Sequence, residues 1–186
     1  MIEENEENEE NNNIDINIDN DEIYDNIQIK TEQYDNGEYK GEFSEGKRNG
    51  QGIYTWKNNS KYEGQFKNDK FDGKGVFTWS NGEKYIGDFK NGNKEGKGIY
   101  MYPSGSKYEG NFINGKRDGK GVFYYKNGNR YEGDFKNDRR NGEGIMYYKD
   151  GSREMGNYSQ DKKVGTHILW HKDGKIETKE YNEKEI

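Results

Sequence analysis

A period of 23 residues runs through most of this chain and restricts what it can fold into. Each unit begins with an aromatic-x-Gly-x-Phe segment and continues to a Gly-x-Gly segment. The units start at Tyr39, Tyr62, Tyr85, Tyr108 and Tyr131, and a weaker sixth unit starts at Glu154. A period of this length without insertions is typical of arrays in which each repeat buries its apolar face only against its neighbours. The chain is therefore expected to be a stack of one module with a long repeated surface.

The composition argues against a conventional two-layer core. Only 27% of the 186 residues are hydrophobic, whereas the chain contains 26 Gly and 16 Tyr. A thin sheet held together by aromatic packing is expected, because each ring buries a large area. There is no cysteine, so disulfides and thiol chemistry are excluded. No signal peptide and no apolar run long enough to cross a bilayer is recognised, so an intracellular protein is expected.

The net charge of −6 conceals two segments of opposite sign. Residues 1–33 carry 12 acids and 1 base, which leaves 36 − 12 = 24 acids and 30 − 1 = 29 bases for the rest, a net +5. We expect an acidic, Asn-rich disordered tail at 1–33, the repeat array at 34–181 and a short C-terminal tail at 182–186. Within the tail, Ile14, Ile16 and Ile18 alternate with polar residues as in an added edge strand, although a solubilising tail is the simpler interpretation.

Each unit is predicted to be a β-hairpin, with strands at 62–66 and 73–79 in the second unit. One connection is a three-residue loop, 57–59 in the first unit, whose last position is always Gly or Asn and is predicted to be left-handed. The other is predicted to be a six-residue loop, 67–72. Side chains alternate across a strand, so a two-residue turn in place of the three-residue loop would scatter the aromatic residues over both faces.

This register predicts an elongated, twisted, single-layer antiparallel β-meander, about 50 to 60 Å long and all-β. Gly52, Gly64 and Gly75 fall in one row with their equivalents, which is expected to be a trough without side chains. Rows of Tyr and Phe lie beside it on the same face. The opposite face mixes Ile and Val, such as Ile53, with charged residues such as Glu63 and is expected to be the wetter one.

The combination of Tyr-x-Gly-x-Phe, Gly-x-Gly and Asn-Gly on this period resembles the MORN (membrane occupation and recognition nexus) repeat. The segment YEGQFKNDKFDGKGVFTWSNG, which starts at Tyr62, is near the family consensus, and the resemblance covers about 34–181. It implies twisted antiparallel hairpins with a groove on one face. MORN arrays occur in junctional proteins, plant phosphoinositide kinases, a histone methyltransferase, radial-spoke heads of cilia and cytoskeletal scaffolds. What they share is a docking surface, and catalysis lies in other domains.

No catalytic, cofactor or metal site is predicted. No acid, base or nucleophile is singled out by a motif. His167 and His171 lie four apart in a predicted strand, which separates them by about 13 Å, too far to bind one metal. The Gly-x-Gly segments lack the Lys-Ser/Thr and the following helix of a phosphate-binding loop. An enzyme is therefore not expected, and nucleic acid is not an expected partner.

Two surfaces are candidates for binding. The first is the aromatic wall of the groove, which consists of Trp56, Trp79, Tyr102, Tyr125, Tyr148, Tyr54, Phe77, Tyr100 and Phe123. The second is a basic edge at the six-residue loops, suited to anionic lipid or an acidic protein lattice. It consists of Lys47, Arg48, Lys70, Lys94, Lys116, Arg117, Arg139, Arg140, Lys162 and Lys163. Acids in the same loops make an ordinary solvated edge the simpler interpretation.

A non-catalytic scaffold or adaptor is therefore predicted, which docks a partner helix or peptide in its Gly and aromatic groove. The family resemblance favours a cytoskeletal or ciliary (axonemal) assembly, with the protein in the cytoplasm, cytoskeleton or cilium. The alternatives are a peripheral membrane or phosphoinositide-binding module and a regulatory partner of a lipid kinase or methyltransferase. Exposed terminal strands also make a homodimer through these strands a further prediction.

Overall fold

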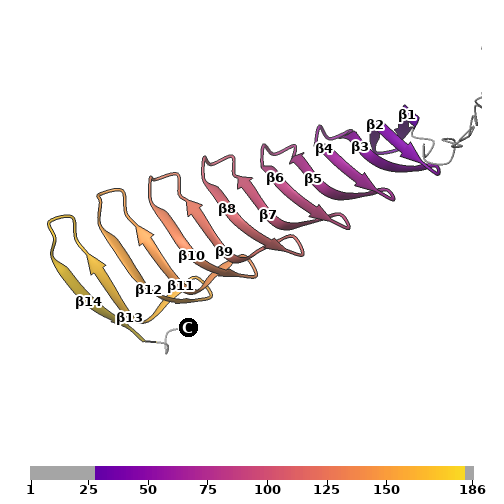
Figure 1. Cartoon of the computed structure of the whole chain (residues 1–186). Coiled ribbons are helices and arrows are strands. Elements are labelled where there is room, and N and C mark those ends of the chain that lie inside the picture. The colour runs from indigo at the N-terminus through magenta and orange to yellow at the C-terminus, as the bar shows by residue number, and fades with distance from the viewer. Residues whose placement is uncertain (1–27, 183–186) are drawn as a thin grey trace, which may run out of the picture.

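The computed structural model describes residues 28–182, which form a single sheet of antiparallel strands in sequence order (Figure 1). The fourteen strands of this part are β1 (Gln28–Tyr34), β2 (Gly37–Ser44), β3 (Lys47–Trp56), β4 (Lys61–Lys67), β5 (Lys70–Thr78), β6 (Lys84–Lys90), β7 (Asn93–Met101), β8 (Lys107–Ile113), β9 (Lys116–Tyr124), β10 (Arg130–Lys136), β11 (Arg139–Tyr147), β12 (Arg153–Ser159), β13 (Lys162–Trp170) and β14 (Ile176–Tyr181). Each strand pairs only with its sequence neighbours. The predicted all-β meander is confirmed.

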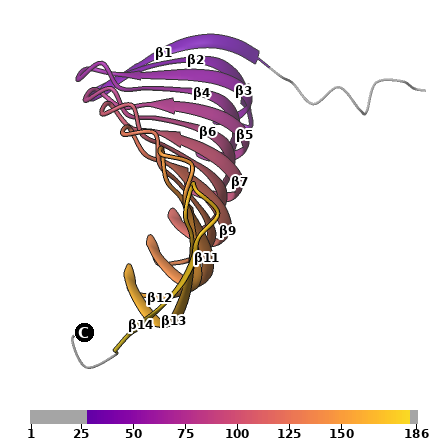
Figure 2. The ribbon, with the colours of Figure 1, turned by 90° about the vertical axis from the view of Figure 1, so that its left-hand side faces the viewer.

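The sheet is an open, twisted ribbon. Figure 2 shows that successive strands rotate progressively and that the strands are bowed. The right-handed twist of individual strands accumulates in this way whenever a sheet does not close on itself. The two faces of the ribbon therefore follow long, curved paths.

The ends of the array differ from the predicted boundaries at one point. Residues 28–33, assigned to the acidic tail from sequence, form most of β1, which pairs with β2 along its whole length. The possible edge strand at Ile14, Ile16 and Ile18 lies outside the described residues. At the other end, β14 pairs with β13 as the start of a seventh, incomplete unit.

The three-residue loops are as predicted. In the first of them, the Trp56 N–H donates to the Ser60 carbonyl at 2.9 Å, and Asn59 is left-handed with φ 67°. Tyr54 consequently pairs with Tyr62. The equivalent last loop residues are all left-handed: Gly82, Gly105, Gly128, Gly151 and Gly174. The restriction of this position to Gly and Asn is explained by its conformation.

The predicted six-residue loop is wrong. Strands β4 and β5 continue until Lys67 pairs with Lys70, and only Asn68 and Asp69 form the turn. Both turn residues have positive φ, 47° and 66°, as a type I′ turn requires. The same two-residue turn closes all six hairpins from β2–β3 to β12–β13.

A bulge inside each of these hairpins reconciles the short turn with the 23-residue period. The register shifts between Gly64 and Phe66, so that two extra residues of β5 lie opposite Gln65. Phe66 therefore pairs with Phe71 instead of Gly73, which was its predicted partner. Because two and six are both even, every residue stays on its predicted face.

Candidate docking surface

The predicted trough without side chains is filled by tyrosines. Tyr85 is fully buried and its ring lies over the glycine row, where a Cβ added to Gly98 would be only 2.4 Å from Tyr85 Cε2. Its hydroxyl donates to the Asp88 carbonyl at 2.9 Å. The same arrangement recurs, with full burial each time, at Tyr39, Tyr62, Tyr108 and Tyr131. The glycines are therefore required for the close approach of a ring, and the row offers no open groove on this face.

Phenylalanines join one unit to the next on the same face. The Tyr85 ring meets Phe89 of its own unit edge-on, with centroids 5.1 Å apart, and Phe112 of the next unit at 5.0 Å. Edge-to-face pairs of this kind add about 0.5 to 1.5 kcal/mol each beyond the area that they bury. Burial also raises the pKa of Tyr39 and of Tyr108 to about 12, so these phenols stay protonated as donors.

The aromatic side chains predicted to bind a partner form a second ladder beside the tyrosines. The Trp79 ring lies 4.4 Å from Phe77 and 5.4 Å from Tyr100, centroid to centroid. Ring contacts of this kind follow one another without a gap along the sheet, from Trp56 at one end to Tyr125 at the other. Tyr54 is buried, and the other eight are half-buried. The eight half-buried side chains are partly accessible, whereas Tyr54 is not, and the role of this set in binding stays a prediction.

The predicted basic edge divides into two sets, because neighbouring strand residues point to opposite faces. One set is exposed at the two-residue turns: Lys47, Lys70, Lys116, Arg139 and Lys162. The other is half-buried and lies over the aromatic face, where it forms what we call the cation column: Arg48, Lys94, Arg117, Arg140 and Lys163. Phe71 occupies the position between Arg48 and Lys94.

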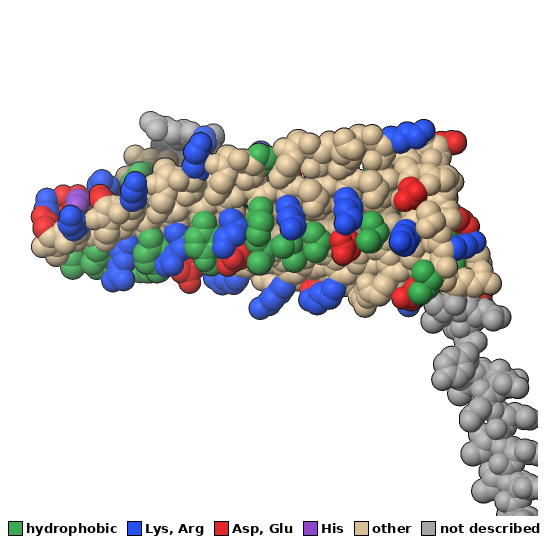
Figure 3. All heavy atoms as spheres, turned by 90° about the horizontal axis from the view of Figure 1, so that it is seen from above, with side chains coloured by type: hydrophobic (Ala, Val, Ile, Leu, Met, Phe, Trp, Pro, Cys, Tyr) green, Lys and Arg blue, Asp and Glu red, His purple; other side chains and the backbone are tan. Residues whose placement is uncertain are grey.

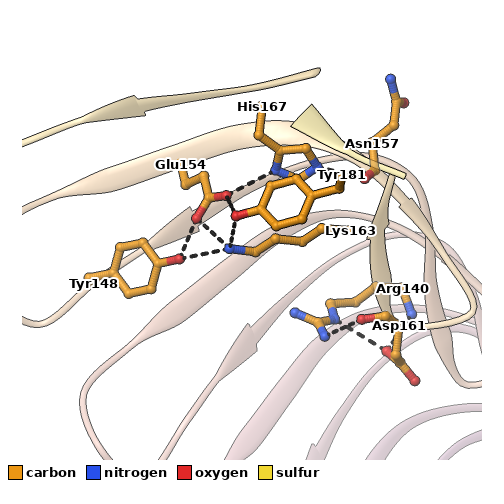
Figure 4. A network of polar contacts seen from close by, with 8 residues as sticks. All are labelled: Arg140, Tyr148, Glu154, Asn157, Asp161, Lys163, His167 and Tyr181. Atoms are coloured by element: carbon orange, nitrogen blue, oxygen red, sulfur yellow. Dashed lines mark hydrogen bonds and ion pairs between the residues drawn. The ribbon is translucent and has the colours of Figure 1, made fainter. Parts of the chain in front are cut away.

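Three arginines of the cation column each bind the aspartate in the turn of the following hairpin, an arrangement that we call the Arg–Asp clamp. Arg117 donates to Asp138 Oδ1 from its backbone N at 2.9 Å and from Nε at 3.2 Å, while Asp138 N donates back to the Arg117 carbonyl at 3.0 Å. The Arg117 guanidinium also lies 5.4 Å from the Phe123 ring centroid. The same Arg–Asp clamp joins Arg48 to Asp69, and it joins Arg140 to Asp161 (Figure 4).

The sixth unit compensates for its missing tyrosine with a histidine from the neighbouring strand. Glu154 stands where the other units have Tyr, and His167 stands where they have the second Gly of the row. The buried His167 ring fills the space over Gly156, whose added Cβ would be 2.2 Å from His167 Cδ2. His167 Nε2 lies 2.8 Å from the Asn157 carbonyl, the group that accepts from Tyr in other units (Figure 4).

Glu154 is at the centre of a polar network that closes this end of the aromatic face (Figure 4). It is almost fully buried and accepts hydrogen bonds from Tyr148 at 2.6 Å, from Tyr181 at 3.1 Å and from Lys163. Burial by itself raises the pKa of Glu154, but the bonds from Lys163 and Tyr148 outweigh it, and the net pKa is lowered. His167 Nδ1 lies 3.2 Å from Glu154 Oε1. In the sequence, Glu154 only marked the start of a weaker sixth unit, and nothing there indicated this network.

Within residues 28–182 no group of three or more His, Cys, Asp or Glu side chains is arranged to hold a metal ion. His171, the other histidine, pairs with Glu177 at 3.1 Å at the end of β13, away from the His167 site. The same residues include no helix of the length and apolarity needed to span a membrane.

The hollowed surface lies on the face opposite the aromatic residues. A hollow of about 1240 Å³ runs from β6 to β13 over the backbones of the glycine row. One wall alternates apolar and acidic side chains, such as Ile99 and Glu109. The other wall is polar, with Lys97 and Asn111 opposite them. The apolar members are Ile86, Ile99, Val122, Ile145, Met155 and Ile168.

A second hollow of about 790 Å³ continues the first toward the N-terminal end. It is lined by Ile53, Val76 and Ile86 on the apolar side, and Ile86 belongs to both hollows. Together they form one feature, the long hollow, which extends from β1 to β13. None of the nine aromatic or ten basic residues singled out from sequence lines it. The available signal was the column of Ile and Val that flanks the glycine row in every unit.

A row of alternating cationic and aromatic residues lies on the same face, nearer to the three-residue loops. Lys107 Nζ is 4.5 Å from the Tyr124 ring centroid, and the Arg130 guanidinium is 4.2 Å from that of Tyr147. Lys107 also pairs with Glu109 at 2.6 Å. Seen from above, basic and hydrophobic side chains alternate along the ribbon (Figure 3). This row forms an outer rim beyond the apolar wall of the long hollow.

Comparison with known families decides the relationship of the chain. A family model described as MORN repeat matches residues 39–61, 62–84, 85–107, 108–130 and 131–153. The chain belongs to the MORN repeat family. Five consecutive MORN repeats therefore account for strands β2 to β11 and the loops between them, and the sixth unit continues the same hairpin architecture beyond the matched region. No curated protein sequence matches this MORN protein.

Solved structures give more distant similarities. The TCP domain of SAS-4 (dCPAP) from Drosophila melanogaster, solved with a proline-rich motif of Ana2 (dSTIL), is 14% identical with a TM-score of 0.49. That match covers 83% of this MORN chain and 90% of the other chain. The TCP10 domain of CPAP from Danio rerio is 12% identical with a TM-score of 0.29 and coverages of 83% and 93%. These values carry no information about what the MORN array binds.

Proposed function

We propose that this MORN array is a non-catalytic scaffold that docks an extended segment of a protein partner in the long hollow. The observation that supports this function is a continuous concave strip on a face that the fold leaves uncovered, with an apolar side chain from at least every second strand on one wall. Concave apolar strips with a polar border are typical of protein interaction sites. On the aromatic face, by contrast, the rings and the cation column occupy the equivalent space.

The width of the long hollow favours an extended chain over a helix. Its two walls come from the residues on either side of each glycine, such as Lys97 and Ile99 beside Gly98. Residues two apart in a strand are separated by about 6.6 Å. A helix with side chains is about 10 to 12 Å across and is too wide to reach the glycine backbones, whereas one extended chain is not.

The length of the long hollow sets the size of the partner segment. It crosses strands spaced about 4.8 Å apart from β1 to β13, so it is about 58 Å long. An extended peptide covers that distance with about 17 residues at 3.3 Å each. Apolar side chains of the peptide would face the wall of Ile99 and Val122, and its polar groups would meet Lys97 and Asn111. We further propose that this partner belongs to a cytoskeletal or ciliary assembly, one of several settings in which MORN arrays occur.

Site-specific photo-crosslinking in cells tests the location of docking. A benzophenone amino acid at Ile99 is expected to crosslink a partner through the long hollow, and the same group at Tyr102 reports on the aromatic face. The crosslinked segment is then synthesised as a peptide and titrated against the full chain.

Matched variants then decide between the two faces. Ile99→Glu with Val122→Glu is expected to weaken the binding of that peptide at least tenfold, because two apolar side chains of the wall are replaced by charges. Trp79→Ala with Tyr102→Ala should change its affinity little. The reverse result would move the docking site to the aromatic face and refute this proposal.

The membrane alternative has a separate test. Of the ten predicted basic residues, only five are exposed at the turn edge, one in each unit except the third, where Asn93 takes this position. We expect the full chain not to float with phosphatidylserine vesicles at low salt. Flotation that is abolished by Lys47→Glu, Lys116→Glu and Arg139→Glu together would establish the peripheral membrane function instead.

A further inference from the structure

One member of the cation column has no acidic partner. Arg48, Arg117 and Arg140 are clamped by the aspartate of the following turn, and Lys163 pairs with Glu154. Among residues 28–182, the side chain of Lys94, which holds the equivalent place on β7, forms no ion pair or hydrogen bond. The fold therefore presents an unpaired ammonium where four of the other units present a neutralised pair.

The missing partner is explained by a glycine in the turn that follows. Gly115 stands where the other clamps have an aspartate, such as Asp138, and its N–H still donates to the Lys94 carbonyl at 2.9 Å. The backbone junction between hairpins is thus preserved, and only the carboxylate is lost. A Cβ added to Gly115 would meet nothing within 4 Å, so the position of the lost carboxylate is open space.

The surroundings make this ammonium a strong receptor for negative charge. Lys94 Nζ lies 4.4 Å from the Tyr100 ring centroid, 5.4 Å from Phe112 and 5.8 Å from Trp79. Burial among these rings lowers the pKa of Lys94, whereas the more distant Asp138 and Glu83 raise it and Arg117 lowers it. A half-buried cation without a contacting anion gains more from a charge-assisted hydrogen bond than an exposed lysine does.

We propose that Lys94 is the anchor for an Asp or Glu side chain of a partner protein, which enters the open position beside Gly115. The partner's carboxylate then forms an ion pair with the Lys94 ammonium, as Asp138 does with the Arg117 guanidinium. Trp79 lies 5.8 Å from Lys94 Nζ, and Tyr102 contacts the Tyr100 ring at 4.8 Å, so both half-buried rings lie close to the site. An apolar or aromatic residue next to the partner's acid therefore packs on their rings. This acidic-segment site lies on the aromatic face, opposite the long hollow, and is independent of docking there.

A substitution copied from another turn of the same chain tests this site. Gly115→Asp places a carboxylate at the position that Asp138 holds in a turn with similar backbone angles, φ +83° and +70°. The variant should form an internal Lys94–Asp pair and close the site. Gly92→Asp is the matched control. The Gly92 N–H donates to the Phe71 carbonyl, as Gly115 does to Lys94, but Phe71 offers no cation for an added carboxylate. A Cβ added to Gly92 also meets nothing within 4 Å.

The probe is a library of short random peptides displayed on phage and selected against the full chain. We expect the enriched peptides to share an Asp or Glu next to an aromatic or apolar residue. Binding of the best sequence, measured by fluorescence anisotropy, should weaken about tenfold or more in Gly115→Asp and in Lys94→Gln, and change less than about twofold in Gly92→Asp. Thermal unfolding of each variant confirms that it is folded.

Three results would overturn the proposal. The first is enrichment without an acidic consensus. The second is a peptide whose affinity is the same in Gly115→Asp as in the parent chain. The third concerns residues 1–27, which contain eleven acids and no Lys or Arg. If replacing those acids by amides in the full chain strengthens peptide binding tenfold, the occupant of the site is this segment of the same chain and not a partner.

Discussion

The exchange of Tyr and Gly for Glu and His in the sixth unit predicts a strong coupling between two positions. Five units place a tyrosine ring over two glycines, and the sixth places His167 over Gly156 from the neighbouring strand. A tyrosine at position 154 and a histidine at position 167 would require the same space. Restoring the consensus at only one position should therefore be damaging, and restoring it at both should not.

The magnitudes follow from the structure. His167→Gly empties a fully buried site and adds a flexible glycine, a loss of about 3 kcal/mol. Glu154→Tyr forces a second ring into an occupied space, a loss of about 2 kcal/mol. The double variant regains the ring contacts and the bond to the Asn157 carbonyl, but it loses the contacts of Glu154 with Lys163. Its net loss of stability is therefore about 2 kcal/mol. The additive expectation is about 5 kcal/mol, so the coupling is about 3 kcal/mol.

Native-state hydrogen exchange of the β12 and β13 amides is the appropriate assay. A repeat array opens locally at its ends, so a global unfolding curve would dilute an effect confined to one unit. Free energies of opening are compared for the parent chain, both single variants and the double variant. If the double variant lost the full sum of about 5 kcal/mol, His167 would not be a substitute for the tyrosine, and the proposed compensation would be refuted.

Three further perturbations have defined outcomes. Tyr85→Phe removes the donor to the Asp88 carbonyl and should lower the free energy of unfolding by about 1 kcal/mol in urea, whereas no change would mean that water replaces the bond. Asp138→Asn weakens the clamp on Arg117; because Asp138 is half-exposed, the loss should stay below about 1 kcal/mol and shrink with added salt. The lowered folded pKa of Glu154 means that its ionised form contributes stability above its ordinary value of 4.5, which is lost as the pH falls through the folded value. Thermal unfolding of Glu154→Gln should therefore depend less on pH in that acidic range, and an unchanged profile would contradict this assignment.

The three-residue loops were predictable because their signal is local. A position that accepts only Gly or Asn, as at Asn59 and Gly82, indicates a left-handed backbone whatever surrounds it. The bulge was not predictable in this way. It depends on the Gln65 side chain, whose Oε1 accepts from Lys74 N at 2.8 Å and covers the left-handed Gly73. The recurring glycine at this position, such as Gly73 and Gly96, is visible in the sequence, but the contact across the two strands that places the bulge there is not.

The candidate sites show the same division. The assignment of aromatic residues to one face was possible from parity alone. Their availability was not, because burial depends on the direction in which each ring lies, and Tyr85 lies over glycines that appeared to be an open trough. Likewise, Lys94 and Arg117 look equivalent in the repeat, and only the turn 21 residues farther along the chain distinguishes them.

The sequence by itself determined the repeating hairpin, the two faces and the single-layer meander, because an odd period and alternating side chains leave few registers in which aromatic residues coincide. Only the tertiary structure decided which face is filled and which is hollow. The reason is that a glycine row is open to both sides of a sheet, and the side that stays open depends on which neighbours lie across it. Here the tyrosines cover one side, and the walls of Ile99 and Lys97 leave the other side as the long hollow.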